Sequence, residues 1–215
     1  MYLAFHCSPE SSFVKKESTK DLFDTQCWLF NLITDPYQVF AEAFCIAGIP
    51  HLRSFIKKVL HYAEANEIYR QESPCDVLLC MRVMRSIIKA ADSLKEIKSG
   101  PIVIAEQDAF NKKYYCSDDL SSTKWDDFPR FLSLKEFCNP YKVFRKFFKY
   151  QKTDEWLHDL EEIVDCALSK NNGELGLEMV TIYSHLVKLA EATHLINVRE
   201  VIHIGGRLKN RFINN

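Results

Sequence analysis

Asp35-Pro36-Tyr37-Gln38-Val39-Phe40 recurs with small changes as Asn139-Pro140-Tyr141-Lys142-Val143-Phe144, 104 positions further along the chain. Asp or Asn before Pro is typical of a helix start, because its side chain caps free backbone N–H groups and Pro suits the first helical turn. Carried on without a gap to Ala63 and Ala167, the comparison keeps Pro, Tyr, Val, two Phe and one Ala identical. The sequence therefore predicts a helical fold that contains one unit twice.

Apolar residues recur at helical spacing after each copy of this motif. The first stripe contains Leu52, Ile56, Val59 and Leu60, and the residues 104 positions later are Trp156, Leu160, Ile163 and Val164. A third helix follows in each half, where Ile87–Asp92 resembles Leu186–Glu191. We expect an all-α protein in which two three-helix units form a pseudo-symmetric bundle. Periodicity shared by unrelated amphipathic helices is the alternative explanation of the match.

Gly, Pro and polar clusters divide the chain into segments. The first helical unit is expected over residues 19–98, with helices over 19–33, 35–47, 50–69 and 75–97. Residues 99–133 read as an irregular linker, in which Pro101–Ile104 and Tyr114–Cys116 leave room for a short β-hairpin. The remaining segments are a poorly ordered N-terminal stretch (1–18), a second helical unit (134–204) and a basic C-terminal tail (205–215).

The composition fits a globular chain with few residues that interrupt helices. The 215 residues are 47% hydrophobic and 27% charged, and they include only 6 Gly and 7 Pro. The net charge of −1 excludes a global attraction to polyanions, so a nucleic-acid partner would need a local basic patch. No apolar run approaches the roughly 18 residues of a membrane-spanning helix. We therefore predict no membrane span.

The chain contains 8 cysteines and no Cys-x-x-Cys pair. That spacing does not favour a structural zinc site. With a chain long enough to form a core, we expect the cysteines to be reduced and mostly buried, and we expect a cytoplasmic location.

Four basic residues, Lys142, Arg145, Lys146 and Lys149, share one side of a predicted helix. The positions 104 residues earlier are Gln38, Ala41, Glu42 and Cys45, so the repeated unit does not require the charge. Together with Arg207, Lys209 and Arg211 in the tail, this helix could bind nucleic-acid phosphates. The alternative is a solvated face, neutralised by the acids of the next helix: Asp154, Glu155, Asp159, Glu161, Glu162 and Asp165.

Charge is inverted between the middle helices of the two halves. Lys57 and Lys58 align with Glu161 and Glu162. Opposite charges at equivalent positions suit an interaction surface between the halves or between two copies of the chain. Drift of surface residues is the alternative explanation.

Glu-x-x-His occurs three times, and this spacing places both side chains on one helix face, as in helical di-metal proteins. Glu191 and His194 are the best candidate metal ligands, because His194 extends an apolar stripe that faces inward. We identify no catalytic triad and no glycine-rich phosphate loop. We predict no cofactor.

The leading hypothesis is therefore a non-enzymatic interaction or adaptor protein, whose partner is another protein or a second copy of the chain. A nucleic-acid-binding protein is the first alternative, and a helical metal-binding protein is the second.

Overall fold

Seven α-helices carry the fold in the part of the chain that the computed structural model describes, residues 20–29, 31–65, 67–71, 73–102, 104–116, 125–170, 176–204 and 207–209. They are α1 (Pro36–Ile46), α2 (Ile49–Glu64), α3 (Pro74–Ser93), α4 (Leu134–Cys138), α5 (Tyr141–Tyr150), α6 (Thr153–Leu168) and α7 (Met179–Glu200). The 3₁₀ helices are η1 (Thr25–Cys27), η2 (Glu106–Asp108) and η3 (Lys112–Tyr114). The strands β1 (Ile202–Ile204) and β2 (Arg207–Lys209) pair antiparallel. The prediction of a mainly helical protein is confirmed.

Side-chain caps explain where several helices begin. The Asp35 carboxylate accepts a hydrogen bond from the Tyr37 N–H at 3.0 Å, and Ser73 accepts one from the Cys75 N–H at 3.2 Å. Each cap satisfies an N–H group that has no partner within the helix. Asn139 does not cap α5, because its side-chain amide donates to the Lys98 carbonyl instead. The two copies of the motif therefore start their helices differently.

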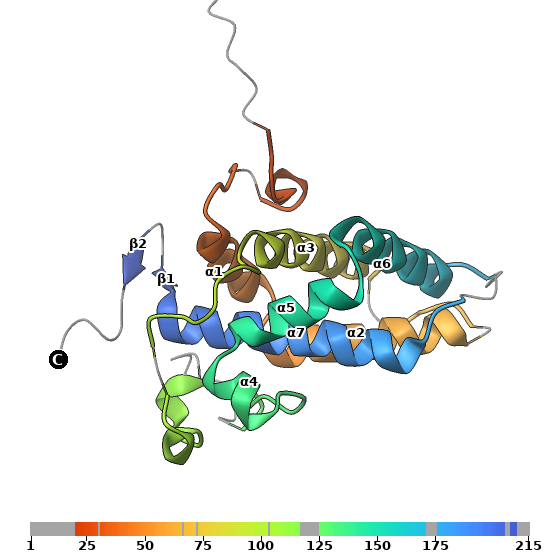
Figure 1. The fold of residues 1–215 in the computed structure, drawn as a ribbon. Coiled ribbons are helices and arrows are strands. Elements are labelled where there is room, and N and C mark those ends of the chain that lie inside the picture. Colours follow the sequence, from red (N-terminus) through yellow and green to blue (C-terminus); the bar gives the residue numbers. More distant parts are fainter. Residues whose placement is uncertain are drawn as a thin grey trace, which may run out of the picture.

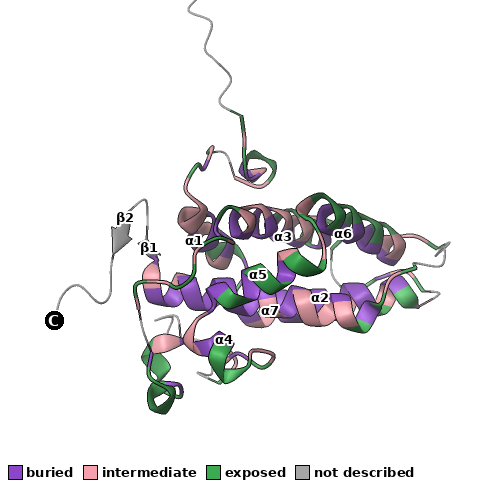
Figure 2. Ribbon diagram, in the orientation of Figure 1, coloured by how far each residue is buried: buried purple, intermediate pink, exposed green. Residues whose placement is uncertain are grey.

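The long helices form two layers, with α3 and α6 in one and α2 and α7 in the other (Figure 1). α2 packs along both α6 and α7, and α6 also packs against α3. Buried residues lie where the layers meet, and exposed residues lie on the outer faces, including those of α5 and α6 (Figure 2). The main core therefore contains residues from both halves of the chain.

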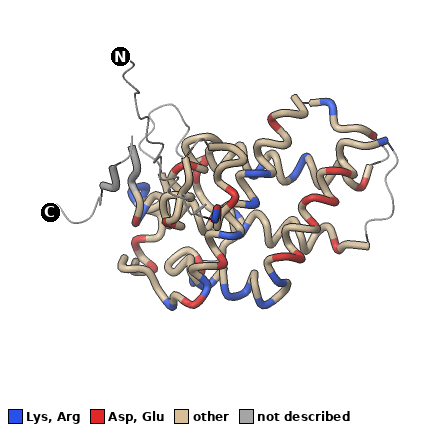
Figure 3. The backbone as a smooth tube through the Cα atoms, turned by 90° about the horizontal axis from the view of Figure 1, so that it is seen from above, with Lys and Arg blue, Asp and Glu red and all other residues tan. Residues whose placement is uncertain are grey.

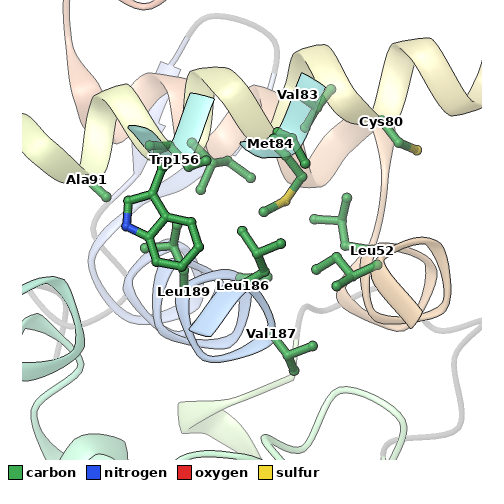
Figure 4. Close-up of a cluster of buried hydrophobic side chains, with 14 of the residues drawn as sticks. Leu52, Cys80, Val83, Met84, Ala91, Trp156, Leu186, Val187 and Leu189 are labelled. Carbon is green, nitrogen blue, oxygen red and sulfur yellow. The ribbon is translucent and has the colours of Figure 1, made fainter. Parts of the chain in front are cut away.

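Trp156 is the largest side chain in this core, and it is 1% exposed. Its ring stacks on Phe147 with the centroids 4.1 Å apart, and its indole N–H donates to the Phe147 carbonyl at 3.3 Å. Figure 4 shows Trp156 of α6 among Met84, Leu186 and Leu189, which come from the facing helices. This residue ties α5 and α6 to the two long helices.

The predicted helix over 19–33 is wrong, because its polar side chains bind the backbone locally. Asp21 accepts from the Gln26 N–H at 2.7 Å, and the Thr25 hydroxyl accepts from the Ile33 N–H at 3.2 Å. Such bonds compete with helical hydrogen bonds. Asp24 also adopts a left-handed conformation, with φ 54°. Only the turn η1 forms within the described part of this segment.

The hairpin predicted in the linker is also wrong for the described residues. The segment contains η2 and η3, and Tyr114 lies in η3 rather than in a strand. The only strands in the described part of the chain are β1 and β2, which follow α7 in the region predicted to end the second unit and begin the tail. The N-terminal stretch 1–18 lies outside the described residues.

We predict that Trp156→Ala lowers the free energy of unfolding by about 3–5 kcal/mol, since it leaves a cavity where a large ring was fully buried. The measurement is urea unfolding followed by circular dichroism. Trp125→Ala is the matched control, because Trp125 is 63% exposed and its loss should change stability by less than about 0.5 kcal/mol. Equal effects from the two substitutions would contradict this assignment of the core.

Candidate interaction surfaces

A buried ion pair joins α2 to α7 and to the linker. The Arg53 Nη1 atom lies 3.0 Å from the Glu191 Oε1 atom, and both side chains are buried. Arg53 also donates to the carbonyls of Phe128, at 2.9 Å, and Asp126. Glu191 accepts from the N–H groups of Arg130 (2.8 Å) and Phe131 (2.9 Å). The end of the linker is therefore fixed to the core by both charges.

Two further residues of α7 hold the same region. The His194 Nε2 atom lies 2.9 Å from the Tyr115 carbonyl oxygen, so Nε2 carries the proton. Arg199 donates to the carbonyls of Tyr114 (2.9 Å) and Phe137 (2.6 Å), and its guanidinium lies over the Phe137 ring. Burial lowers the pKa of His194 to about 4 and that of Arg199 to about 10. At neutral pH His194 is uncharged and Arg199 is charged.

Glu191 and His194 both point inward, but they have separate partners. The Glu191 oxygens already accept three hydrogen bonds, and His194 is bound to the linker backbone. No group of three or more potential metal-ligating side chains occurs among the described residues. The arrangement supports a structural role for both residues and gives no support to the metal hypothesis.

A second polar chain links the two copies of the Pro-Tyr motif. The hydroxyl oxygens of Tyr37 and Tyr141 lie 3.0 Å apart, and the Tyr141 hydroxyl donates to Glu200 Oε2 at 2.5 Å. Burial raises the pKa of both Tyr141 and Glu200. A β-carbon at Gly100 would overlap the Tyr141 ring and the Glu200 carboxylate, so this position has room only for glycine.

Three aromatic rings form a surface patch on the linker, which we call the aromatic platform (Phe110, Trp125 and Phe128). Phe110 stacks on Phe128 with centroids 5.8 Å apart, and Trp125 meets Phe128 at 6.0 Å. Phe110 is 69% exposed and Trp125 is 63% exposed. This platform was not predicted from the sequence. The available signal was the presence of large aromatics within a polar, irregular segment.

The predicted basic residues of α5, here called the basic strip (Lys142, Arg145, Lys146 and Lys149), are all exposed. Lys146 pairs with Glu136 of α4 at 2.7 Å, and Arg145 donates to the Lys98 carbonyl at 3.2 Å. Lys142 and Lys149 have no ion-pair partner among the described residues. Elsewhere Lys and Arg alternate with Asp and Glu over most of the chain, so the strip is a local feature (Figure 3).

The buried carboxylate of Glu136 caps the start of α4 and forms an ion pair with Lys146 of the basic strip. Burial alone would raise its pKa, but hydrogen bonds from Lys146 and from Ser133 outweigh this effect and lower the pKa to about 2. Ser133 and Glu136 form a reciprocal capping box. Glu136 therefore stays ionised at neutral pH and neutralises one of the four charges of the strip.

The charge-inverted acids Glu161 and Glu162 each contact a residue outside the aligned pairs. Glu161 pairs with Arg85 of α3, and Glu162 lies 3.3 Å from His158 on its own helix. Lys57 is exposed on α2. The ion pair between α3 and α6 is thus made by Arg85, which was not among the interaction residues predicted from the sequence.

Few of the tail residues can be placed. Arg207 and Lys209 lie in β2, and only their backbone is described. Arg211 lies outside the described residues. The tail therefore adds no described side chain to the basic strip.

The seven cysteines in the described part of the chain are all free. Only Cys80 is buried, whereas Cys27, Cys45 and Cys75 are exposed, so the expectation that most cysteines lie in the core is wrong.

Among the described residues, no single helix is both long and apolar enough to cross a membrane; α1 and α2 meet the criterion only as a pair, across an 80° bend.

No protein-family model, no curated protein and no solved structure matches this chain. The inference of function therefore rests on the contacts and surfaces described above.

The lowered pKa of His194 predicts a loss of stability in acid. An unfolded histidine titrates near pH 6.5, so between pH 6.5 and pH 4 the unfolded chain binds a proton that the folded chain excludes. From pH 7 to pH 5 this difference should cost about 2 kcal/mol. His194→Gln keeps a donor for the Tyr115 carbonyl and should remove that share of the pH dependence in urea titrations. An unchanged slope in the variant would refute the assignment.

Proposed function

We propose that this chain is a non-enzymatic protein-interaction or adaptor protein, and that its partner docks on the aromatic platform. The observation that carries the proposal is the exposure of Phe110 and Trp125, at 69% and 63%, in contact with Phe128. Grouped exposed aromatics are typical of interaction sites, where such rings contribute much of the binding free energy.

The base of the platform is held in place before any partner binds. Arg53 donates to the Phe128 carbonyl, and the Phe128 ring packs edge-on against Tyr115 with centroids 5.0 Å apart. Phe128 also stacks on the buried Phe137. A pre-ordered surface loses less conformational entropy when it binds. This rigidity favours a docking role over a passive connection between helices.

We propose further that the fold arose by duplication of a three-helix unit, α1–α3 and α5–α7. α2 and α6 have equal lengths and bounds that differ by 104 residues, the offset of the sequence match. Two pairs of residues at this same offset touch: the hydroxyls of Tyr37 and Tyr141, and the rings of Phe40 and Phe144 at 6.3 Å. Contacts between equivalent residues are expected close to a two-fold axis.

The duplication predicts that α1–α3 superpose on α5–α7 after a rotation close to 180°. A superposition of the Cα atoms measures the rotation. A best rotation far from two-fold, or a match of only one helix pair, would leave shared helical periodicity as the explanation.

Nucleic-acid binding is the second candidate, and the basic strip favours it. Lys142 and Lys149 are exposed and have no ion pair with a described residue, so they are available to phosphates. Binding of this kind weakens steeply as salt rises, because released counterions drive it.

We also propose a cytoplasmic location. Three exposed free thiols, Cys27, Cys45 and Cys75, are consistent with a reducing compartment. Oxidation of these thiols in protein isolated from the native host under trapping conditions would argue against it.

The test of function is capture of partners from lysate of the native host, with and without nuclease, followed by mass spectrometry. We expect protein partners that survive nuclease and that are lost with Phe110→Ser/Trp125→Ser, since the double substitution removes both exposed rings. Leu22→Ser/Val180→Ser is the matched control, because these residues are exposed apolar side chains elsewhere, at 55% and 79%.

Loss of the same partners with both double variants would contradict a specific role for the platform. Partners that disappear with nuclease, and that depend on the basic strip, would favour the nucleic-acid candidate instead.

A further inference from the structure

The outer face of α6 is acidic along its whole length. Its exposed residues follow helical spacing over 12 residues and comprise five acids and one histidine: Asp154, Glu155, His158, Glu161, Glu162 and Asp165. We call the five acids the acidic stripe. Asp159 does not belong to it, because it is buried and accepts a hydrogen bond from Gln151. The stripe follows about 16 Å of helix, and the basic strip on α5 follows about 10 Å.

These two faces of opposite charge do not neutralise each other within one molecule. Among the described residues, Lys146 pairs with Glu136 of α4, and Glu161 pairs with Arg85 of α3. Glu162 contacts His158 of its own helix. Lys142, Lys149 and Asp165 have no ion-pair partner among the described residues. Both faces point outward in Figure 2, so each is accessible to another molecule.

The fold itself does not require either set of charges. The α1 counterparts of the basic strip are Gln38, Ala41, Glu42 and Cys45. The α2 counterparts of the acidic stripe, 104 positions earlier, contain no acid: Pro50, His51, Lys57, Lys58 and His61. α2, a helix of the same length as α6, thus folds with neutral or basic residues at these positions. The charges on α5 and α6 are a property of the surface in one half only.

We propose that the basic strip of one copy docks on the acidic stripe of a second copy, so that the chain associates with itself. Complementary charge on the two helical faces identifies the occupant. Four basic residues at helical spacing meet five acids at helical spacing. The net charge of −1 adds almost no overall repulsion between copies. In a two-fold dimer each copy presents both faces, so the contact forms twice.

Contact between the basic strip and the acidic stripe should be weak to moderate in affinity and sensitive to salt. Exposed ion pairs contribute roughly 0–1 kcal/mol each, so the association is weak to moderate and depends on several pairs acting together. Salt screens such pairs within about 10 Å at 0.1 M and within a few ångströms near 1 M. The contact goes beyond the proposed function, because it uses neither Phe110 nor Trp125. Its failure would leave binding at the aromatic platform untouched.

The experiment is analytical ultracentrifugation of the full chain at about 50 mM and about 500 mM salt. We expect self-association at low salt and a dissociation constant at least about tenfold higher at high salt. Lys142→Glu/Arg145→Glu/Lys149→Glu gives both faces a net negative charge, and Asp154→Lys/Glu162→Lys/Asp165→Lys gives both faces a net positive charge. Each triple variant alone should be monomeric. An equimolar mixture of the two should associate again, because complementary faces are restored between the copies.

The control is Arg70→Glu/Lys112→Glu/Lys170→Glu, which changes the net charge by the same amount as the α5 variant, at exposed positions outside the strip. It should associate like the unmodified chain, and circular dichroism checks that every variant is folded. A monomer at low salt, association that ignores salt, or a mixture that fails to associate would overturn the proposal. Binding of a single-stranded oligonucleotide through the strip by a monomeric chain would overturn it in favour of nucleic acid.

Discussion

The Arg53–Glu191 ion pair is the interaction on which the rest of the structure depends. Buried charges cost a large desolvation free energy unless each is paired and hydrogen-bonded. Here the backbone of the linker supplies the missing partners: Arg53 donates to carbonyls before Pro129, and Glu191 accepts N–H groups just after it. His194 and Arg199 repeat this pattern further along α7, with the carbonyls of Tyr115 and Phe137. An irregular segment is thereby fixed to a helix without forming regular structure of its own. Because the same bonds hold Phe128, the buried pair also positions the aromatic platform.

The two halves of the chain share one core rather than two. α2 packs mainly on α6 and α7, and Trp156 of α6 lies against residues of α3 and α7. Each half therefore buries its apolar faces only when the other half is present. Such an arrangement is expected to unfold cooperatively, since neither three-helix unit retains a core of its own. The contact between Tyr37 and Tyr141, with its extension to Glu200, adds a half-buried polar link between the two halves.

Function on this scaffold depends on surfaces that the packing leaves free to vary. Positions matched between the halves are mostly apolar, because both units must fill the same core. Exposed positions differ: α5 is basic where α1 is largely neutral, and α6 is acidic where α2 is not. The aromatic platform lies outside the matched helices altogether. A fold by itself does not specify a function, and the candidate sites here are features of the surface of a helical protein. Association through charged faces and docking through aromatic rings also leave different experimental signatures, because salt weakens only the first.

The sequence by itself determined the structural features that depend only on residues close together along the chain. The cap at Asp35, the apolar stripe of α2 and the exposed basic face of α5 all follow from residues within a few turns, so they could be predicted. The region 19–33 could not, because its hydrogen bonds from Asp21 and Thr25 compete locally with a helix and Trp28 is held by the distant Ser86. Tertiary structure alone decided that Glu191 pairs with Arg53, and that Phe110 and Trp125 meet on Phe128. Those outcomes join residues far apart in sequence, and the free energy of burying charges and rings depends on partners that no local pattern contains.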